Sequence, residues 1–405
     1  MPPSELSEKE GPGGGWDIYQ IALQDDPYSS WQRIREDSPV LSKGDGVFFV
    51  SRWDLVDTVL RDPRHLAGTG VSASFGASEG LAADAMRAWL MSLDGAEQTR
   101  ARGLVRRSFT PRQTTELESF VRSTARALIS ELTGLAQETS ADLISGLAFP
   151  LPSSVIRSLF GVDRDEWHEE VEAVLRAPQR AEDGGVGMIE ALAQYFERRL
   201  SRDEIPSGLL SQLRRSDPEF GELTSLEVIA NAVLLVTAAI DTTAGLIGNC
   251  LRCVIDRPSL QAHLRLQPDS IGDAVEETLR FEPPALSCSR TAGFSLELAG
   301  VTVPAGSALL LGIGAANRDP HRYPDPDHFS LNRDRSNLLS FGGGRHFCLG
   351  ATLARMEART ALEQFLEAST PAWETVEAPQ WQAQNPTIRA QERLLVRSRS
   401  GGESS

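Results

Sequence analysis

The residues with the clearest chemical potential lie in the cysteine loop, from Phe341 to Gly350, where a glycine run precedes one cysteine. Three consecutive glycines, residues 342–344, let the backbone approach a flat group closely or take a positive φ. Cys348 precedes a stretch with helical spacing that runs to about Glu367. A thiol just before a helix N-terminus is stabilised as the thiolate by the helix dipole and free N–H groups. We therefore predict a functional thiolate at Cys348; the alternative is an inert buried cysteine in a turn.

An acid and two hydroxyl groups interrupt the most apolar stretch of the chain. Residues 241–243 are Asp-Thr-Thr, and they follow the largely apolar residues 231–240. A capping box at residues 224–227, with no helix breaker before residues 257–258, predicts one central helix of about 32 residues, roughly 48 Å long. Burial of a carboxylate is costly unless it is paired or functional. Two interpretations fit this position. The acid and a hydroxyl form a reactive pair, or the aspartate forms a salt bridge and the two threonines bond to the preceding turn.

The elements that must position these groups are mostly helices. Residues 16–63 read as helix, short strands and helix, with residues 47–51 as the clearest strand. From residue 83 to 279 the apolar spacing is mostly helical. Residues 294–303 alternate in hydrophobicity around Ala299-Gly300 and predict a hairpin. The sequence therefore predicts a mainly α fold with small β-sheets.

The chain shows no internal repeat and no linker that would divide it. We expect a single domain over residues 16–396, between a disordered N-terminal tail (1–15) and a flexible C-terminal tail (397–405). Residues 67–82 are rich in Gly, Ser and Ala, which predicts a mobile loop.

Composition excludes several classes of protein. The 405 residues include 40 Lys+Arg and 56 Asp+Glu, and a net charge of −16 disfavours nucleic acid as a partner. No stretch resembles a signal peptide or membrane span, so a cytoplasmic protein is expected. Cys250 and Cys253 have the spacing of a redox or zinc pair, but the helical pattern around them favours ordinary helix packing.

Together and in order, these motifs resemble those of the soluble bacterial cytochrome P450 family of haem-thiolate monooxygenases, from about residue 26 to 396. The cysteine loop matches at Phe341, Gly344, Cys348 and Gly350. The resemblance implies the cytochrome P450 fold, with haem b between the long central helix and the helix after the cysteine loop. It implies that Cys348 is the axial iron ligand, since thiolate donation favours O–O cleavage, and that Phe341 shields the sulfur.

The same resemblance assigns four residues to the haem propionates. His346 and Arg290 match positions that bind them. Arg102 matches the arginine of a His-x-x-x-Arg pattern, whereas Gln98 stands where the histidine is usual. Gln98 can still donate a hydrogen bond but supplies no charge.

Residues 238–243 resemble the family's Ala-Gly-x-Asp/Glu-Thr-Thr segment on the central helix. This implies that Asp241 and Thr242 are the acid and alcohol that deliver protons to dioxygen, and that Ala238 lies against the haem. Ala239 replaces the usual glycine, so a narrower oxygen groove is expected.

Glu277 and Arg280 match the family's Glu-x-x-Arg pair, whose role is structural. At i, i+3 their side chains share a helix face. In the family the pair joins a later basic residue, and here His328 stands closest to that position. We therefore expect a weaker lock that is sensitive to pH between 5 and 8.

The segments that the family places above the haem supply mainly apolar candidates for a substrate pocket, with core packing as the alternative for each. They are Met86, Trp89, Leu90, Leu235, Ala238, Ala285, Leu286 and Ile388. The resemblance implies hydroxylation or epoxidation of a small, largely lipophilic molecule with dioxygen. Oxidative coupling or ring formation, and a non-catalytic haem-binding sensor, are the alternative functions.

Electrons are expected from outside the chain, since no residues remain for a flavin or iron–sulfur domain, and the resemblance implies a ferredoxin and a ferredoxin reductase as their source. Residues 97–112 carry a local excess of four positive charges that an acidic ferredoxin would recognise, with a solvated helix face as the alternative. The arginines are Arg100, Arg102, Arg106, Arg107 and Arg112, and Arg345 and Arg355 extend the patch.

Overall fold

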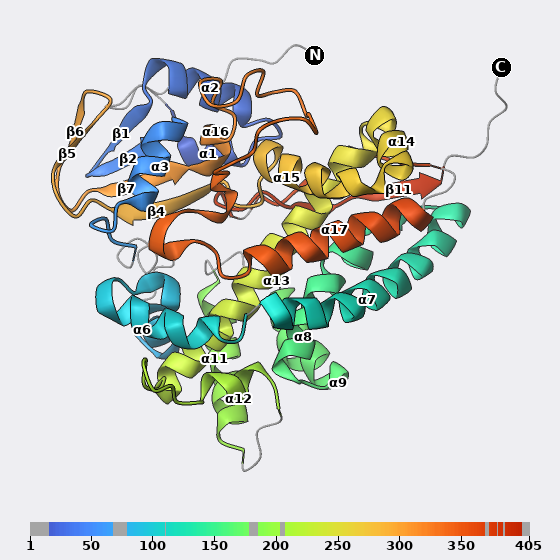
Figure 1. Ribbon diagram of the computed structural model, residues 1–405, viewed down its shortest axis with the longest axis horizontal. Helices are drawn as coiled ribbons and strands as arrows, with labels where there is room; N and C mark the ends of the chain where they lie inside the picture. Colours follow the sequence, from blue (N-terminus) through green and yellow to red (C-terminus); the bar gives the residue numbers. More distant parts are fainter. Residues whose placement is uncertain are drawn as a thin grey trace.

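The computed structural model describes residues 16–67, 79–109, 111–177, 185–202, 207–368, 372–378, 380–383 and 385–398. Figure 1 shows the largest sheet at the upper left, with long helices filling most of the remaining molecule. The predicted N-terminal tail and most of the predicted 67–82 loop lie outside the described residues. The mainly α fold with small sheets is confirmed.

The main helices differ widely in length, and two of them exceed 25 residues. They are α1 (Ile18–Ala22), α2 (Tyr28–Asp37), α3 (Trp53–Arg61), α5 (Leu81–Ala88), α6 (Gly95–Arg106), α7 (Pro111–Glu138), α8 (Pro150–Phe160), α9 (Arg164–Trp167), α10 (Ala173–Leu175), α11 (Val186–Leu200), α12 (Leu209–Leu213), α13 (Ser225–Ile255), α14 (Pro258–Leu266), α15 (Ile271–Phe281), α16 (Ile313–Ala316) and α17 (Ala351–Ala368).

The strands form four small sheets. The largest has the order β1-β2-β7-β4, in which β2 and β7 are parallel and the other pairs antiparallel. The strands are β1 (Val40–Gly44), β2 (Val47–Val50), β3 (Ala141–Asp142), β4 (Ser287–Thr291), β5 (Leu296–Leu298), β6 (Val301–Val303), β7 (Ala308–Gly312), β8 (Trp373–Thr375), β9 (Gln380–Trp381), β10 (Gln391–Arg393) and β11 (Leu395–Ser398).

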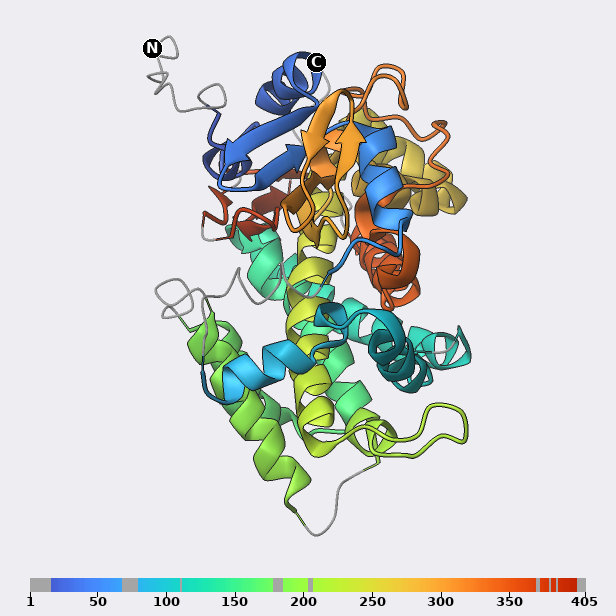
Figure 2. The same cartoon turned by 90° about the vertical axis from the view of Figure 1, so that its left-hand side faces the viewer.

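The long central helix is α13, and its N-terminus forms as predicted. Thr224 accepts a hydrogen bond from the Glu227 N–H at 3.2 Å, and the Glu227 carboxylate accepts one from the Thr224 N–H at 2.8 Å. This reciprocal capping box satisfies two N–H groups that the helix itself cannot pair. Figures 1 and 2 show α13 running through the middle of the molecule, with α5, α8, α11 and α17 packed around it.

By length and composition α13 is apolar enough to cross a membrane, which the short run 231–240 did not suggest. However, 61% of its most apolar window is buried inside the protein. Its apolar surface is thus matched by neighbouring helices, and α13 is a core helix, as predicted. Cys250 and Cys253 are buried on it, and burial raises the pKa of Cys253 to about 12, consistent with the predicted packing role.

Two local predictions have clear outcomes. The hairpin is confirmed: β5 and β6 pair in antiparallel, and Ala299 and Gly300 take φ of 47° and 80° at the turn. The start of the C-terminal tail at residue 397 is wrong, because Arg397 and Ser398 belong to β11 and pair with β8. Residues 399–405 lie outside the described residues.

Candidate functional site

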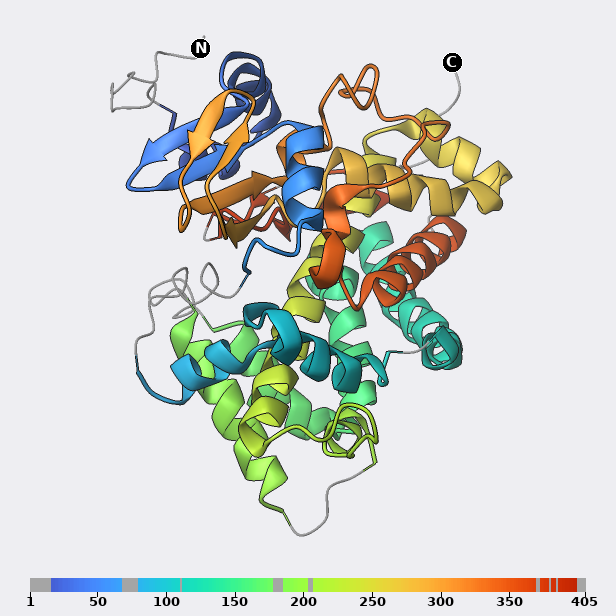
Figure 3. The same cartoon turned by 60° about the vertical axis from the view of Figure 1, so that its left-hand side comes forward.

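The conformation of the cysteine loop depends on backbone hydrogen bonds within the loop and on two glycines with positive φ. The Cys348 N–H donates to the Phe341 carbonyl at 3.0 Å. Gly342 and Gly344 have φ of 71° and 63°, which favours glycine. A Cβ at Gly344 would lie 2.5 Å from the Leu60 carbonyl oxygen of α3, and Figure 3 shows the loop passing beside that helix. The loop therefore rests on the backbone of α3.

Cys348 lies before α17, as expected, with its thiol open to solvent on one side. The N–H groups of Gly350 and Ala351 and the charges of Arg102 and Arg355 lower its pKa. Burial by the surrounding protein outweighs them and raises the pKa of the Cys348 thiol above its ordinary value. Stabilisation of the thiolate by the N-terminus of α17 stays a prediction. A coordinated metal cation reverses this balance, because a coordinating thiol is deprotonated.

Three side chains that can carry positive charge gather beside the loop. Arg102 donates through Nη2 to the Phe347 carbonyl at 2.5 Å. The buried Arg290 donates through Nη1 to the Ser289 carbonyl at 2.8 Å. Burial and then the charge of Arg290 lower the pKa of His346, and Arg102 acts in the same direction. The structure thus brings together three of the four residues predicted to hold propionates.

Two contacts that the sequence did not suggest hold the loop from α6. His346 Nε2 lies 3.3 Å from Asp94 Oδ1, and the other Asp94 oxygen accepts from the Ala67 N–H at 2.9 Å. Gln98 is buried and donates through Nε2 to the Arg345 carbonyl at 2.9 Å. In the sequence, only the position of Asp94 directly before a helix could have indicated a role for this residue. The contact of Gln98 with a propionate stays a prediction.

The residues around the cysteine loop fit haem. Arg102 and Arg290 form no ion pair with an Asp or Glu among the described residues. A guanidinium shielded from water needs a compensating anion, and the two carboxylates of haem would supply it. The Cys348 thiol, open on one side, is a soft ligand for iron.

The middle of α13 exposes a small patch on a helix that is otherwise largely buried. Ala238 is exposed and Asp241 and Thr242 are half-buried, whereas Ile240 and Thr243 are buried. Thr242 Oγ1 donates to the Ala238 carbonyl at 2.7 Å, which is the bond back to the preceding turn that was considered for these threonines. This bond does not exclude a reactive role, because the hydroxyl lies at an open position.

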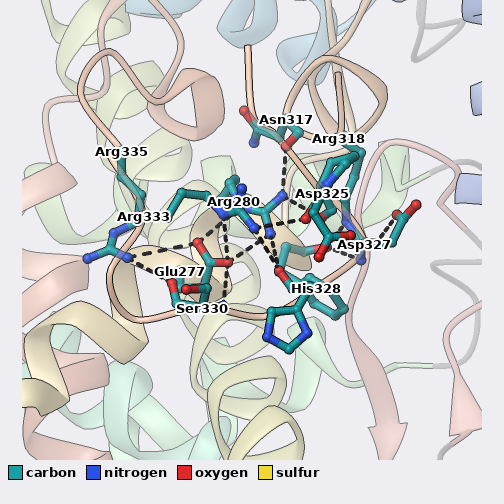
Figure 4. Close-up of polar contacts among 12 residues, drawn as sticks. Glu277, Arg280, Asn317, Arg318, Asp325, Asp327, His328, Ser330, Arg333 and Arg335 are labelled. Carbon is teal, nitrogen blue, oxygen red and sulfur yellow. Dashed lines mark hydrogen bonds and ion pairs between the residues drawn. The ribbon is translucent and has the colours of Figure 1, made fainter. Parts of the chain in front are cut away.

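A buried ion-pair cluster lies behind the cysteine loop (Figure 4). Glu277 accepts two hydrogen bonds from Arg280, at 2.8 and 3.0 Å, and both side chains are completely buried. Its carboxylate also accepts from the Ser330 N–H at 2.9 Å and lies 3.4 Å from Arg333 Nε. The predicted pairing of Glu277 with Arg280 is confirmed.

The predicted role of His328 in this cluster is wrong. Its side chain is exposed, and only its backbone carbonyl takes part, accepting from Arg280 at 3.2 Å and from Arg333 at 3.0 Å. The later basic residue is Arg333, five positions further along the chain. Because its guanidinium does not titrate near neutrality, the predicted pH sensitivity of the lock has no structural basis.

Half of the predicted pocket residues keep some exposed surface in a region of apolar packing. They are Leu235, Ala238, Ala285 and Ile388. Ala285 and Ile388 face each other in an antiparallel β-bridge, so two segments far apart in the sequence meet there.

The other predicted pocket residues are buried. Met86, Trp89 and Leu90 belong to the hydrophobic cluster around α5, α11 and α13. Leu286 packs in a different cluster, with Trp31 of α2. Core packing therefore describes Leu286 better than a pocket position.

Two arginines of the basic patch around α6 are neutralised by ion pairs that the sequence did not reveal. Arg100 pairs with Glu227, the capping residue of α13. Arg107 Nη1 lies 2.9 Å from Asp217. Arg106 is exposed and has no ion pair among the described residues. The local excess of positive charge is therefore smaller than the sequence predicts.

Flanking arginines add little to this patch. Arg355 pairs with Glu276, and Arg345 is half-buried. The side chain of Arg112 lies outside the described residues.

Comparisons with known proteins agree on one family. Residues 172–369 match the family model described as cytochrome P450. The chain is 34% identical over 391 residues to cytochrome P450 monooxygenase PikC of Streptomyces venezuelae, covering 93% of this chain and 92% of the relative. It is 31% identical over 367 residues to 6-deoxyerythronolide B hydroxylase of Saccharopolyspora erythraea, covering 85% and 89%.

Solved structures share the fold. The structure of P450BioI in complex with an acyl carrier protein ligated to hexadec-9Z-enoic acid has a TM-score of 0.82 at 27% identity, covering 93% of this chain and 99% of the other. Cytochrome P450 PksS from Bacillus subtilis has a TM-score of 0.83 at 26% identity, covering 95% and 100%.

Proposed function

Because the chain belongs to the cytochrome P450 family and is a monooxygenase that binds haem b, we propose that Cys348 is the axial ligand of its iron. The observation that carries this assignment is a cysteine, open on one side, at the N-terminus of α17. The N–H groups of Gly350 and Ala351 lower the pKa of this thiol and so favour the thiolate that iron would bind. Arg102, Arg290 and His346 hold the propionates.

When bound, haem supplies the activation of dioxygen and the transfer of one oxygen atom to substrate. Asp241 and Thr242 supply the protons. Thr242 Oγ1 donates to the Ala238 carbonyl at rest, and rotation of its O–H toward the open side would let it donate to oxygen. Asp241 is half-exposed, so water can replace the proton that it passes on.

The substrate is a small, largely lipophilic organic molecule that is hydroxylated or epoxidised in bacterial secondary metabolism. Apolar residues with exposed surface, Leu235, Ala238, Ala285 and Ile388, support this class. The similarity to 6-deoxyerythronolide B hydroxylase, named for hydroxylation of such a molecule, supports it too.

A ferredoxin and its reductase supply the electrons, in the cytoplasm, and the exposed Arg106 on α6 is part of the docking surface. One domain over residues 16–398 serves this site, because α13 packs against helices from α5 to α17 along the chain.

The test is the spectrum of the reduced protein under carbon monoxide. The native protein is expected to give a thiolate-type, red-shifted Soret band. Cys348→His should bind haem and lose that band, whereas Cys288→Ser, a change at another cysteine not fully buried, should keep it. A native protein without this band, or a Cys348→His variant that retains it, would refute the assignment.

A further inference from the structure

Two buried asparagines lie on the face of α13 that carries Thr242, one toward each end. Asn231 and Asn249 are 1% and 0% exposed. The two asparagines are about five turns of 3.6 residues apart, so both side chains leave the helix in the same direction. The side chain of Thr242 leaves the helix within about 20° of that direction, measured around the helix axis. Buried amides need partners, and both find them outside α13.

Asn231 holds the segment that follows α5. Its Oδ1 accepts a hydrogen bond from the Leu90 N–H at 3.1 Å. Its Nδ2 donates to the Glu227 carbonyl at 2.8 Å, which fixes the amide on α13. Leu90 begins a single 3₁₀ turn after α5; the sequence predicts it for the pocket, and in the structure it is buried in the cluster around α5, α11 and α13. Asn231 therefore ties the first wall of the pocket to α13.

Asn249 holds two segments at the other end of this face. Its Nδ2 donates to the Glu282 carbonyl and to the Arg389 carbonyl, both at 3.0 Å. These carbonyls flank the Ala285–Ile388 bridge, where the second wall of the pocket forms. One amide group thus fixes both segments of that wall.

The second wall is rigid because Arg389 is itself anchored. Its guanidinium lies 3.0 Å from the Glu282 carboxylate and stacks 3.5 Å above the Trp381 ring. It also donates to the Gln24 carbonyl at 2.6 Å, and Tyr28 donates to the same carboxylate at 2.7 Å. Movement of this wall relative to α13 would have to break several buried contacts.

Gly245 shows how closely the second wall approaches α13. It lies on the same face, between Thr242 and Asn249. A Cβ at Gly245 would lie 3.1 Å from Pro284 Cβ and 3.2 Å from Ala390 Cβ. Any larger residue would displace the wall by a few tenths of an ångström.

We propose that Asn231 and Asn249 are positioning residues that hold the two walls of the substrate pocket at fixed distances from Thr242. The proposal rests on the proposed function, because it takes Thr242 and the two walls as parts of one active site. Loss of either amide leaves a buried N–H or two buried carbonyls without partners, so the attached wall must move or admit water.

The experiment uses the ferric holoenzyme and two probes that ligate haem iron. Imidazole is small, whereas 4-phenylimidazole must also fit between the walls. In Asn231→Leu and Asn249→Leu, 4-phenylimidazole should bind about tenfold more weakly, equal to about 1.4 kcal/mol, while imidazole changes less than about twofold. Thr237→Val is the matched control, since Thr237 Oγ1 bonds only within α13.

Hydrogen exchange reports each wall separately. Asn231→Leu should speed exchange of the Leu90 amide alone. Asn249→Leu should instead speed exchange of the Leu286 and Arg389 amides. These two amides donate across the second wall, to the Thr387 carbonyl at 2.8 Å and to the Pro284 carbonyl at 2.7 Å. If Asn249→Leu does not fold, Gly245→Ala tests the same wall and should weaken 4-phenylimidazole selectively.

Three results separate this proposal from the proposed function. A native protein without the thiolate-type band would refute the proposed function. If the band is normal but the variants bind imidazole and 4-phenylimidazole equally more weakly, only the positioning role is overturned. Unchanged amide hydrogen exchange in both walls would overturn it too.

Discussion

Gly344 carries the tightest backbone constraint in the cysteine loop. Its φ of 63° lies in the left-handed region that favours glycine. A Cβ at this position would also lie 2.5 Å from the Leu60 carbonyl oxygen, which leaves no room for a side chain. Neighbouring Gly343 meets only side-chain atoms beyond 3.0 Å. A side chain at position 344 would therefore move the loop, and with it the sulfur of Cys348.

Gly344→Ala should destabilise the protein by about 1–3 kcal/mol, because it combines a left-handed φ with a backbone clash. It should also lower haem retention. Gly272→Ala on α15, where no atom lies within 4 Å of the added Cβ, is the control and should be neutral or slightly stabilising. Chemical unfolding and the ratio of Soret to protein absorbance measure both effects. Equal behaviour of the two variants would contradict the constraint.

Glu357 on α17 is a buried acid outside the proposed chemistry. Its Oε2 has no hydrogen-bond partner among the described residues, and burial raises its pKa from the ordinary 4.5 to about 8. Between these values the folded state binds more protons than the unfolded state, so Glu357 makes stability fall as pH rises from 4.5 to 8.

Glu357→Gln should remove this decline in the free energy of unfolding, which is at most about 1.4 kcal/mol per pH unit. The variant should match the wild type near pH 5 and exceed it at pH 8, because the amide cannot ionise. Urea unfolding at pH 5, 6.5 and 8 measures the difference. A difference that stays constant across this range would show that Glu357 titrates normally.

At the scale of elements, the Glu277 cluster joins α15 to the irregular segment before the cysteine loop. Arg333 reaches Glu277 from 56 residues away and also donates to the carbonyls of Asp325 and His328, at 2.8 and 3.0 Å. The cluster is therefore a junction of charge-assisted hydrogen bonds, stronger than neutral ones.

Arg333→Leu should lower the free energy of unfolding by about 1–3 kcal/mol, because the carbonyls of Pro324 and Asp325 and the buried Glu277 carboxylate lose their bonds to Arg333. His328→Ala, which keeps the backbone carbonyl, is the matched control and should change stability little. Haem retention measured from pH 5 to 8 should be the same in His328→Ala and the wild type. A pH-dependent loss in His328→Ala alone would restore the rejected role of the imidazole.

Elements with local signals could be predicted from the sequence. The ends of α13 follow from its capping box and from unbroken apolar spacing, and the hairpin follows from Ala299 and Gly300. Strands β8 to β11 were missed because runs of two to four residues show no readable alternation. Within the site, Cys348 was predicted from its position before a helix, whereas the Glu277 pair was predicted from the family resemblance, because a Glu-x-x-Arg spacing occurs on many amphipathic helices. Asp94, Arg333 and the two asparagines of α13 were not predicted, since their partners lie far away in the sequence.

For the whole molecule, the net charge of −16 hides how individual charges are used. Arg100 and Arg107 look like a docking surface in the sequence. In the structure, Arg100 ties α6 to the N-terminal turn of α13, and Arg107 ties it to the loop around Asp217. Electrostatic steering of an acidic partner therefore depends on fewer residues than the sequence suggests.

Arg106→Glu is the clearest test of the docking surface. Charge reversal at Arg107 would also break its ion pair with Asp217 and place a second acid beside that aspartate. We expect reduction of the haem by an acidic ferredoxin to slow about 5- to 10-fold at low ionic strength, with a smaller difference at high salt, since exposed charges are screened. Arg33→Glu is the control: Arg33 is exposed on α2, which lies at the top of Figure 1 and well apart from α6, and its reversal changes net charge equally. If both variants slow reduction equally, the effect comes from net charge and α6 is not the docking surface. If only Arg106→Glu slows it, the exposed Arg106 on α6 directs electron entry in a strongly acidic protein.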